Sequence, residues 1–154
     1  MEQRFLRQAI DLAVENVRRN GGPFGAVIVR AGVAIATGCN LVTSTNDPTA
    51  HAEVVAIREA CRILGSFQLA GCDVYSSCEP CPMCLGALYW ARPSRIFFAA
   101  TQQDAAAAGF DDSFIYREIK TPVPERTLPT IHVMDEFARR PFDDWAKKAD
   151  KTTY

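Results

Sequence analysis

The sequence predicts an α/β fold in which helices cover both faces of a mixed five-stranded sheet, as a three-layer α/β/α sandwich. Short apolar runs typical of buried strands alternate along the chain with longer segments of helical period. Residues 72–100 follow the order strand, helix, strand, which implies a parallel crossover. A chain of 154 residues is large enough for one core, so we expect a single domain over residues 1–154.

Each element has a local signal. Amphipathic stripes predict the helices, and short apolar runs bounded by turn residues predict the strands. Ala31-Gly32 marks the turn of a hairpin, and Asp47 or Thr49 is expected to cap the second helix. In chain order we expect helix 3–19, strands 23–30 and 33–39, helix 50–64, strand 72–77, helix 80–91, strand 95–100, helix 104–109, strand 130–134 and helix 142–148.

Composition narrows the classes of partner. A net charge of -1 gives no electrostatic reason to expect nucleic acid or an anionic membrane. The N-terminus is charged and periodic, unlike a signal peptide, and no apolar run approaches the ~18 residues that a membrane span needs. We therefore expect a cytoplasmic protein without a membrane partner. Its six cysteines would then stay reduced, for metal binding or catalysis rather than disulfides.

The stretch S76-S-C-E-P-C-P-M-C-L-G86 carries three of these cysteines. Cys81 and Cys84 are three positions apart, so they share one face of a first helical turn, where the helix N-terminus favours the thiolate. Cys78 is the alternative ligand, either in place of Cys81 or as a fourth member of a closed structural site. The other thiols are expected to be small buried hydrophobes: Cys39, Cys61 and Cys72.

Only two histidines can supply a third ligand. His132 lies in an apolar run and is expected in the core, whereas His51 lies two residues before Glu53. Alone, that pair would suggest an ordinary surface histidine beside a solvated glutamate. Together, H51-A-E53 and P80-C-P-M-C84 match the H-x-E…P-C-x-x-C signature of zinc deaminases. We expect one zinc ion per subunit, held by His51, Cys81 and Cys84, with the fourth position open as in catalytic sites.

An open zinc site next to a carboxylate predicts hydrolytic deamination. Zinc lowers the pKa of a bound water from ~15.7 toward ~7, which provides hydroxide at neutral pH to attack an amine-bearing ring carbon. Glu53 is near enough to His51 to take the proton of that water, carry it to a ring nitrogen and then protonate the leaving amine. Glu53 is therefore the predicted catalytic proton shuttle.

The chain resembles the bacterial guanine deaminases of the cytidine deaminase-like superfamily almost from end to end. The likeness is carried by G22-P-F-G-A-V-I-V29, N46-D-P-T-A-H-A-E53, residues 77–93, D104-A-A-A-A-G-F-D-D-S-F-I-Y116 and the closing Tyr154. The resemblance implies a five-stranded sheet and the conversion of guanine to xanthine and ammonia. It also implies a homodimer that exchanges C-terminal segments, here about residues 113–154.

The resemblance further implies a pocket for a purine base. It places there Phe24, Asn40, Ala52, Trp90, Asp112 and Tyr154. Asn40 and the Ala52 amide would contact the base, Phe24 would stack on it, and Asp112 and Tyr154 would reach the neighbouring subunit. Guanine has adjacent N–H donors that a carboxylate such as Asp112 would accept, so Asp112 joins Glu53 among the candidate catalytic residues. Without the resemblance these would be core aromatics, a solvated aspartate and a frayed terminus.

Four other functions fit parts of the sequence. The same motifs occur in tRNA-editing adenosine deaminases, although Asp143 and Asp144 interrupt the only basic cluster that we would assign to phosphate. Other small amino-heterocycles, such as triazines or cytosine, share the chemistry. A silent zinc-stabilised interaction domain would have no use for Glu53. A cysteine-nucleophile hydrolase would need a histidine placed as base for a thiol, and the sequence places neither histidine in that role.

Overall fold

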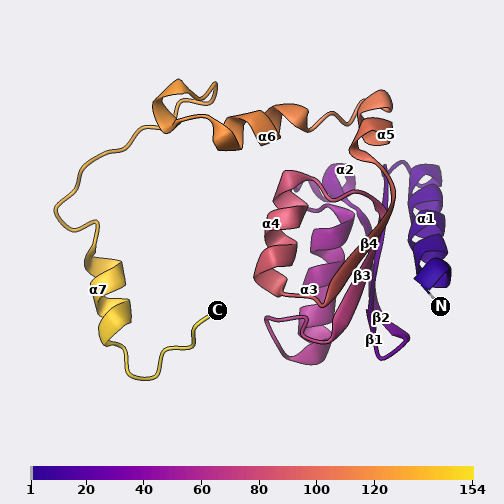
Figure 1. Cartoon of the computed structure of the whole chain (residues 1–154), viewed down its shortest axis with the longest axis horizontal. Coiled ribbons are helices and arrows are strands. Elements are labelled where there is room, and N and C mark those ends of the chain that lie inside the picture. The colour runs from indigo at the N-terminus through magenta and orange to yellow at the C-terminus, as the bar shows by residue number, and fades with distance from the viewer. Residues whose placement is uncertain (1) are drawn as a thin grey trace. The chain divides into compact units, whose positions relative to one another are not determined.

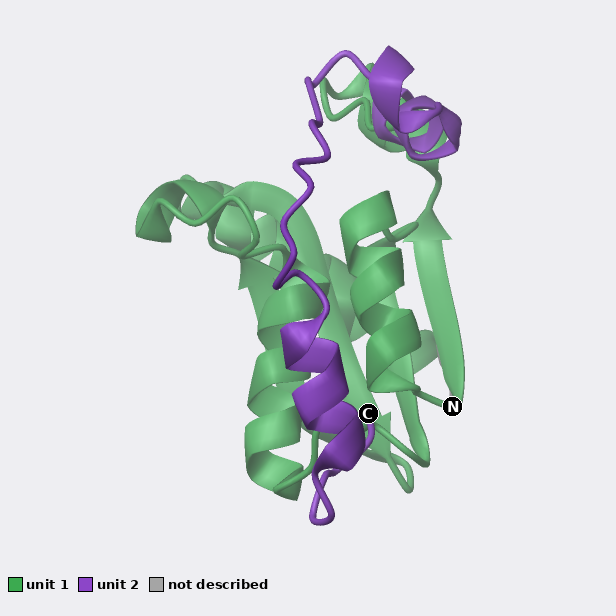
Figure 2. Ribbon diagram, turned by 90° about the vertical axis from the view of Figure 1, so that its left-hand side faces the viewer, with its two compact units in different colours: residues 1–113 green, residues 114–154 purple. Residues whose placement is uncertain are grey.

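The computed structural model describes residues 2–154, which fall into two compact units (Figure 2). The first unit ends at Ser113 and contains the whole sheet, whereas the second covers Phe114–Tyr154. Among the described residues, no helix is long and apolar enough to cross a membrane.

A four-stranded mixed sheet forms the centre of the first unit in the described part of the chain (Figure 1). Its order is β2-β1-β3-β4. β1 (Gly22–Arg30) is antiparallel to both β2 (Val33–Asn40) and β3 (Cys72–Cys78), and β4 (Arg95–Ala100) is parallel to β3. Positive φ angles at Ala31 and Gly32 (50° and 76°) close the hairpin between β1 and β2. The parallel β3–β4 pair and the hairpin confirm the sequence prediction.

Helices cover both faces of this sheet, which confirms the layered α/β class (Figure 1). Side chains of β1 alternate between the faces, since successive residues of a strand point in opposite directions. Ala26 and Ile28 belong to a core with α3, whereas Val27 and Val29 pack with Phe5 of α1. The helices of this unit are α1 (Glu2–Arg18), α2 (Val42–Thr45), α3 (Ala52–Leu64), α4 (Pro82–Ala91) and α5 (Gln102–Ala107).

Two glycines allow helices to lie close against the sheet. A Cβ on Gly25 of β1 would lie 2.3 Å from the carbonyl oxygen of Ala9 in α1. A Cβ on Gly38 of β2 would lie 2.1 Å from the carbonyl oxygen of Ala52 and 2.7 Å from the amide nitrogen of Ala56, both in α3. These are backbone atoms, so a side chain at either position would require a whole helix to move.

We expect Gly38→Ala to lower the free energy of unfolding by about 1–3 kcal/mol or more, because overpacking against backbone cannot be relieved by a rotamer change. Urea denaturation measures this loss. Gly86→Ala is the matched control, since a Cβ there meets nothing within 4 Å. Alanine replaces glycine inside α4 in that variant, so it should be neutral or stabilising by up to about 1 kcal/mol. Equal destabilisation by both variants would contradict the close packing of α3 on β2.

The second unit carries α6 (Ser113–Lys120, which begins at the last residue of the first unit), a 3₁₀ turn (Val123–Glu125) and α7 (Arg140–Lys147). The predicted last helix is confirmed and begins two residues earlier than expected, whereas α6 was not predicted. Residues 130–134 have no regular secondary structure, so the predicted fifth strand is wrong. Since a strand needs a hydrogen-bonded neighbour, an alternating apolar run alone is insufficient. His132 is exposed, and its predicted place in the core is wrong as well.

Candidate metal centre and its surroundings

The starts of two helices bring three metal-ligating side chains together. His51 directly precedes α3, Cys81 directly precedes α4, and Cys84 lies in the first turn of α4. Nδ1 of His51 is 3.5 Å from Sγ of Cys81 and 3.5 Å from Sγ of Cys84. The ligand atoms of the three residues all lie within 4.8 Å of one another. Pro82 at the first position of α4 costs no hydrogen bond, because amides of a first turn lack helical acceptors.

This group fits a zinc ion in both chemistry and spacing. Zinc binds thiolate sulfur at about 2.3 Å and imidazole nitrogen at about 2.0–2.1 Å, so tetrahedral geometry separates the two atoms by about 3.6 Å. The two observed nitrogen–sulfur distances are both 3.5 Å. Three protein ligands leave one tetrahedral position for water or substrate, as in catalytic zinc sites.

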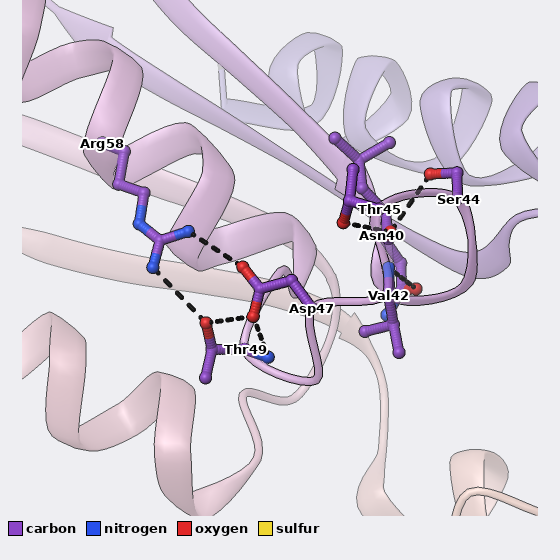
Figure 3. Close-up of polar contacts among 8 residues, drawn as sticks. Asn40, Val42, Ser44, Thr45, Asp47, Thr49 and Arg58 are labelled. Carbon is purple, nitrogen blue, oxygen red and sulfur yellow. Dashed lines mark hydrogen bonds and ion pairs between the residues drawn. The ribbon is translucent and has the colours of Figure 1, made fainter.

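A hydrogen-bonded loop that contains Asp47 and Thr49 leads to His51, and Figure 3 shows its contacts with Arg58. The Asp47 carboxylate accepts hydrogen bonds from the Thr49 amide (2.8 Å) and hydroxyl (2.7 Å). Arg58 of α3 pairs with Asp47 (3.5 Å) and donates to the Thr49 hydroxyl (3.4 Å), which ties the loop to the helix that follows. The expectation that Asp47 or Thr49 caps α3 is therefore wrong. Asp47 closes a local turn instead, and His51 occupies the N-cap position.

Glu53 is buried, with 5% of its surface exposed, beside the three ligands. Its Oε1 accepts a hydrogen bond from the Ser76 hydroxyl at 3.0 Å, and its Oε2 accepts one from the Cys84 thiol at 3.3 Å. Burial raises the pKa of this carboxyl. Sequence reasoning missed Ser76, although its place on β3, in alternation with Cys72 and Val74, was a signal that it faces α3.

The three thiols of the CEPCPMC stretch differ in environment. Interactions with Cys84 and His51 lower the pKa of Cys81 to about 4, whereas the interaction with Cys81 and burial raise the pKa of Cys84. Burial raises the pKa of Cys78 to about 11, and its thiol points to the carbonyl oxygen of Thr101 (3.6 Å). Among the described residues, the ligand group contains Cys81 and Cys84 without Cys78.

The remaining cysteines only partly match the expectation that they are buried hydrophobes. Cys72 is buried, whereas Cys39 and Cys61 are half-buried, and Cys61 packs against the core beneath α3.

The end of β2 lies against the segment that leads to His51. The Leu41 amide donates to the carbonyl oxygen of Ala50 at 2.9 Å, which holds the end of β2 against the residue before His51. Asn40 and Ala52 are both buried. The Asn16 side chain of α1, which sequence reasoning missed, donates to the carbonyl oxygen of Asn40 at 2.8 Å. The amide of Ala52 lies in the first turn of α3, where it has no helical acceptor and can face a ligand.

The other predicted pocket residues, Phe24, Trp90, Asp112 and Tyr154, lie on elements other than β2 and α3 or at some distance along the chain from His51. Phe24 meets Phe110 edge to face, with ring centroids 5.0 Å apart, and Gln102 donates to Asp112 at 2.6 Å. Trp90 is 64% exposed and lies in the last turn of α4, whereas Cys81 and Cys84 lie at the start of that helix. Tyr154 is 71% exposed and belongs to the second unit.

Comparisons with known proteins agree with this geometry. Residues 1–100 match the family of the cytidine and deoxycytidylate deaminase zinc-binding region. The chain is similar to a guanine deaminase of Bacillus subtilis, with 58% identity over 97% of both chains. The X-ray structure of guanine deaminase from Bacillus subtilis superposes with a TM-score of 0.97 at 57% identity, over 99% of this chain and 98% of that one. A tRNA-specific adenosine deaminase of Aquifex aeolicus is 43% identical over 62% of this chain and 64% of its own.

Proposed function

The chain belongs to the cytidine and deoxycytidylate deaminase family, and from this premise we propose that it is a zinc-dependent hydrolase that deaminates guanine. The reaction consumes guanine and water and releases xanthine and ammonia. The observation that carries the proposal is the extent of the likeness. It covers 97% of this chain for the guanine deaminase and 53–71% of it for the tRNA deaminases that the chain also resembles.

His51, Cys81 and Cys84 hold the zinc ion in this proposal, since their spacing fits its bond lengths. When bound, zinc would supply a water of lowered pKa. Glu53 would carry one proton of the attacking water to a ring nitrogen and the second, from the hydroxyl that this water becomes, to the amine that leaves. Its burial keeps bulk water from the transferred proton, and hydrogen bonds from Ser76 to Oε1 and from Cys84 to Oε2 hold the carboxyl group beside the ligands.

Purine recognition follows from the residues around this centre. Asn40 and the Ala52 amide bind polar edges of the base, and Phe24 stacks on its face. Asp112 accepts the adjacent N–H donors of guanine, which adenine and cytosine do not offer. A pocket built on such hydrogen bonds can reject an analogue that lacks them by about 10⁴-fold. Asp112 acts with Glu53 at the reacting edge of the base.

The same proposal includes a homodimer in which segments from about residue 113 to residue 154 are exchanged. Exposed apolar side chains of this segment support it, since a folded monomer rarely leaves many of them uncovered. They include Ile131, Val133, Met134, Phe142 and Tyr154. Trp90 and Tyr154 then complete the pocket across the dimer. Asp112 was expected to reach the neighbouring subunit as well, but we place it in the pocket of its own chain, because Gln102 holds its carboxylate and Phe110, two residues before it, contacts Phe24 of the same chain. A cytoplasmic location fits the six cysteines, none of which is paired in the structure.

Ammonia release from zinc-loaded protein tests the proposed substrate. The protein is offered guanine, adenine, cytosine, a triazine such as ammeline and an anticodon stem-loop RNA with an adenosine at the wobble position, each at equal concentration. We expect guanine to react at least about 100-fold faster than adenine and cytosine, because neither of these offers the adjacent N–H donors that the Asp112 carboxylate accepts, whereas the lactam form of ammeline does. Reaction of the RNA alone would contradict the proposal and favour the tRNA-specific activity.

A further inference from the structure

We propose that Gln102 is a positioning residue, which aims the Asp112 carboxylate at the purine and connects it to the segment that carries Cys81. This inference rests on the proposed function, because Asp112 is a substrate contact only there. It concerns Gln102, which lies at the first position of α5 and belongs to no part of the signature motif.

Gln102 makes two hydrogen bonds, each to a different segment of the chain. Its side-chain amide donates to Oδ1 of Asp112 at 2.6 Å, and its backbone amide donates to Oε2 of Glu79 at 3.1 Å. Glu79 lies two residues before Cys81, and its own amide donates to the carbonyl oxygen of Ala100, the last residue of β4, at 2.9 Å. Gln102 therefore connects the segment that leads to Cys81 with the Asp112 carboxylate.

The backbone of Gln102 is rigid enough to act as a support. Thr101 and Asp104 form a capping box on either side of it, in which each side chain is hydrogen-bonded to the backbone of the other residue. The bond from the Gln102 amide to Glu79 anchors the same turn. Backbone bonds of this kind survive replacement of the side chain, so the side chain can be altered without removing the anchor.

Asp112 needs such a support because its own backbone does little to fix the direction of its side chain. Residues 110–112 have no regular secondary structure and follow Gly109, which has a φ of 92°. The neighbouring residues are held on both sides, since the Phe110 amide donates to the carbonyl oxygen of Ala105 at 2.9 Å and the Ser113 amide donates to Oδ1 of Asp111 at 2.9 Å. The Phe110 ring also lies against Phe24, the residue proposed to stack on the base. This contact places the Asp112 segment beside the proposed pocket, and the bond from Gln102 sets the direction of the carboxylate.

A glutamine suits this task better than a charged residue. Its amide NH₂ donates to one carboxylate oxygen and leaves the other free to accept from a ligand. A lysine or arginine would neutralise Asp112 and compete with the N–H donors of the base. A glutamate would place a second negative charge against the first.

A double-mutant cycle on zinc-loaded protein tests the inference, with kcat, KM, zinc content and melting temperature measured for each variant. The variants are Gln102→Leu, Gln102→Glu, Asp112→Asn and the double variant Gln102→Leu with Asp112→Asn. Gln103→Leu is the matched control, because Gln103 is the same residue type on the same helix and is exposed.

We expect Gln102→Leu to lower kcat/KM for guanine about tenfold, the loss typical of a hydrogen bond to a charged group. Gln102→Glu should lower it further. The division of the loss between kcat and KM should follow that of Asp112→Asn, and Gln102→Leu should have almost no further effect once Asp112 is asparagine. Zinc content, melting temperature and the activity of Gln103→Leu should not change.

Three outcomes would overturn the inference, each at a different step. Wild-type protein that releases no ammonia from guanine overturns the proposed function and this inference with it. Active wild type with a fully active Asp112→Asn removes the role of Asp112 alone. In the third outcome, wild type is active and Asp112→Asn is impaired, but Gln102→Leu lowers kcat/KM as much in the double variant as it does alone. This would show that Gln102 has a structural role independent of Asp112.

Discussion

Replacement of Glu53 by glutamine should leave zinc bound and lower turnover of guanine by about 10²–10⁴-fold, the range expected when a positioned proton carrier is lost. The amide has nearly the shape of the carboxyl group, and its oxygen can still accept the hydrogen bond from Ser76. It cannot take a proton from water or return one to the leaving amine. The fold and the ligands stay in place, so the loss falls on kcat.

Ammonia release and zinc content, measured on the same sample, check this prediction. Glu59→Gln is the matched control, since Glu59 lies on the same helix but pairs with Arg62 at the surface. It should keep full activity and full zinc. Turnover of Glu53→Gln within threefold of wild type would remove Glu53 from the proton path. Loss of zinc in that variant would instead make Glu53 part of the metal site.

Cys84→Ala should abolish both zinc binding and activity, whereas Cys78→Ala should retain both. Cys84 supplies one of the three ligand atoms, and two remaining ligands hold zinc too weakly for a catalytic site. The Cys78 thiol, with its pKa raised to about 11 by burial, points away to the carbonyl oxygen of Thr101. Zinc content by mass spectrometry and the rate of ammonia release separate the two variants.

Cys78→Ala and Cys84→Ala are well-matched variants, because both cysteines are buried and each substitution removes one sulfur atom from the same region. Similar small losses of apoprotein stability are therefore expected from both. If Cys78→Ala also lost its zinc, the site would contain a third thiolate as its fourth ligand and would be closed to water. The proposed hydrolysis would then have no position for its nucleophile.

Local sequence signals predicted the first unit well because each of its elements satisfies its own pattern. β1 and β2 are apolar runs joined by an Ala-Gly turn, and α4 begins at a proline. The failures arose where a local pattern depended on a distant partner. Residues 130–134 alternate like a strand but have no neighbouring strand in the described structure, and the cap signal at Asp47 is used by a turn.

In the candidate site, too, the residues with a local signal were predicted and those with a distant partner were missed. The H-x-E and P-C-x-x-C motifs correctly indicated that His51, Cys81 and Cys84 lie together, since helix starts are local features. The supporting residues were not visible in the sequence, because their partners lie far away along the chain. Ser76 bonds to a residue of α3, Asn16 to the end of β2, and Gln102 to a loop ten residues on. Strand pairing and helix packing had to be known before these polar residues had partners.

The alternating side chains of β1 also determine how the first unit unfolds. This strand pairs with both of its neighbours and contributes residues to the cores on both faces of the sheet. Neither layer of helices can therefore detach without exposing apolar surface that the same strand shares with the other layer. Unfolding of the two faces is thermodynamically linked. A substitution that weakens the packing of α1 on the sheet therefore also destabilises the ligands at the start of α3 and α4. Zinc binding is thus sensitive to the stability of the whole sheet, including the face that does not contact the metal centre.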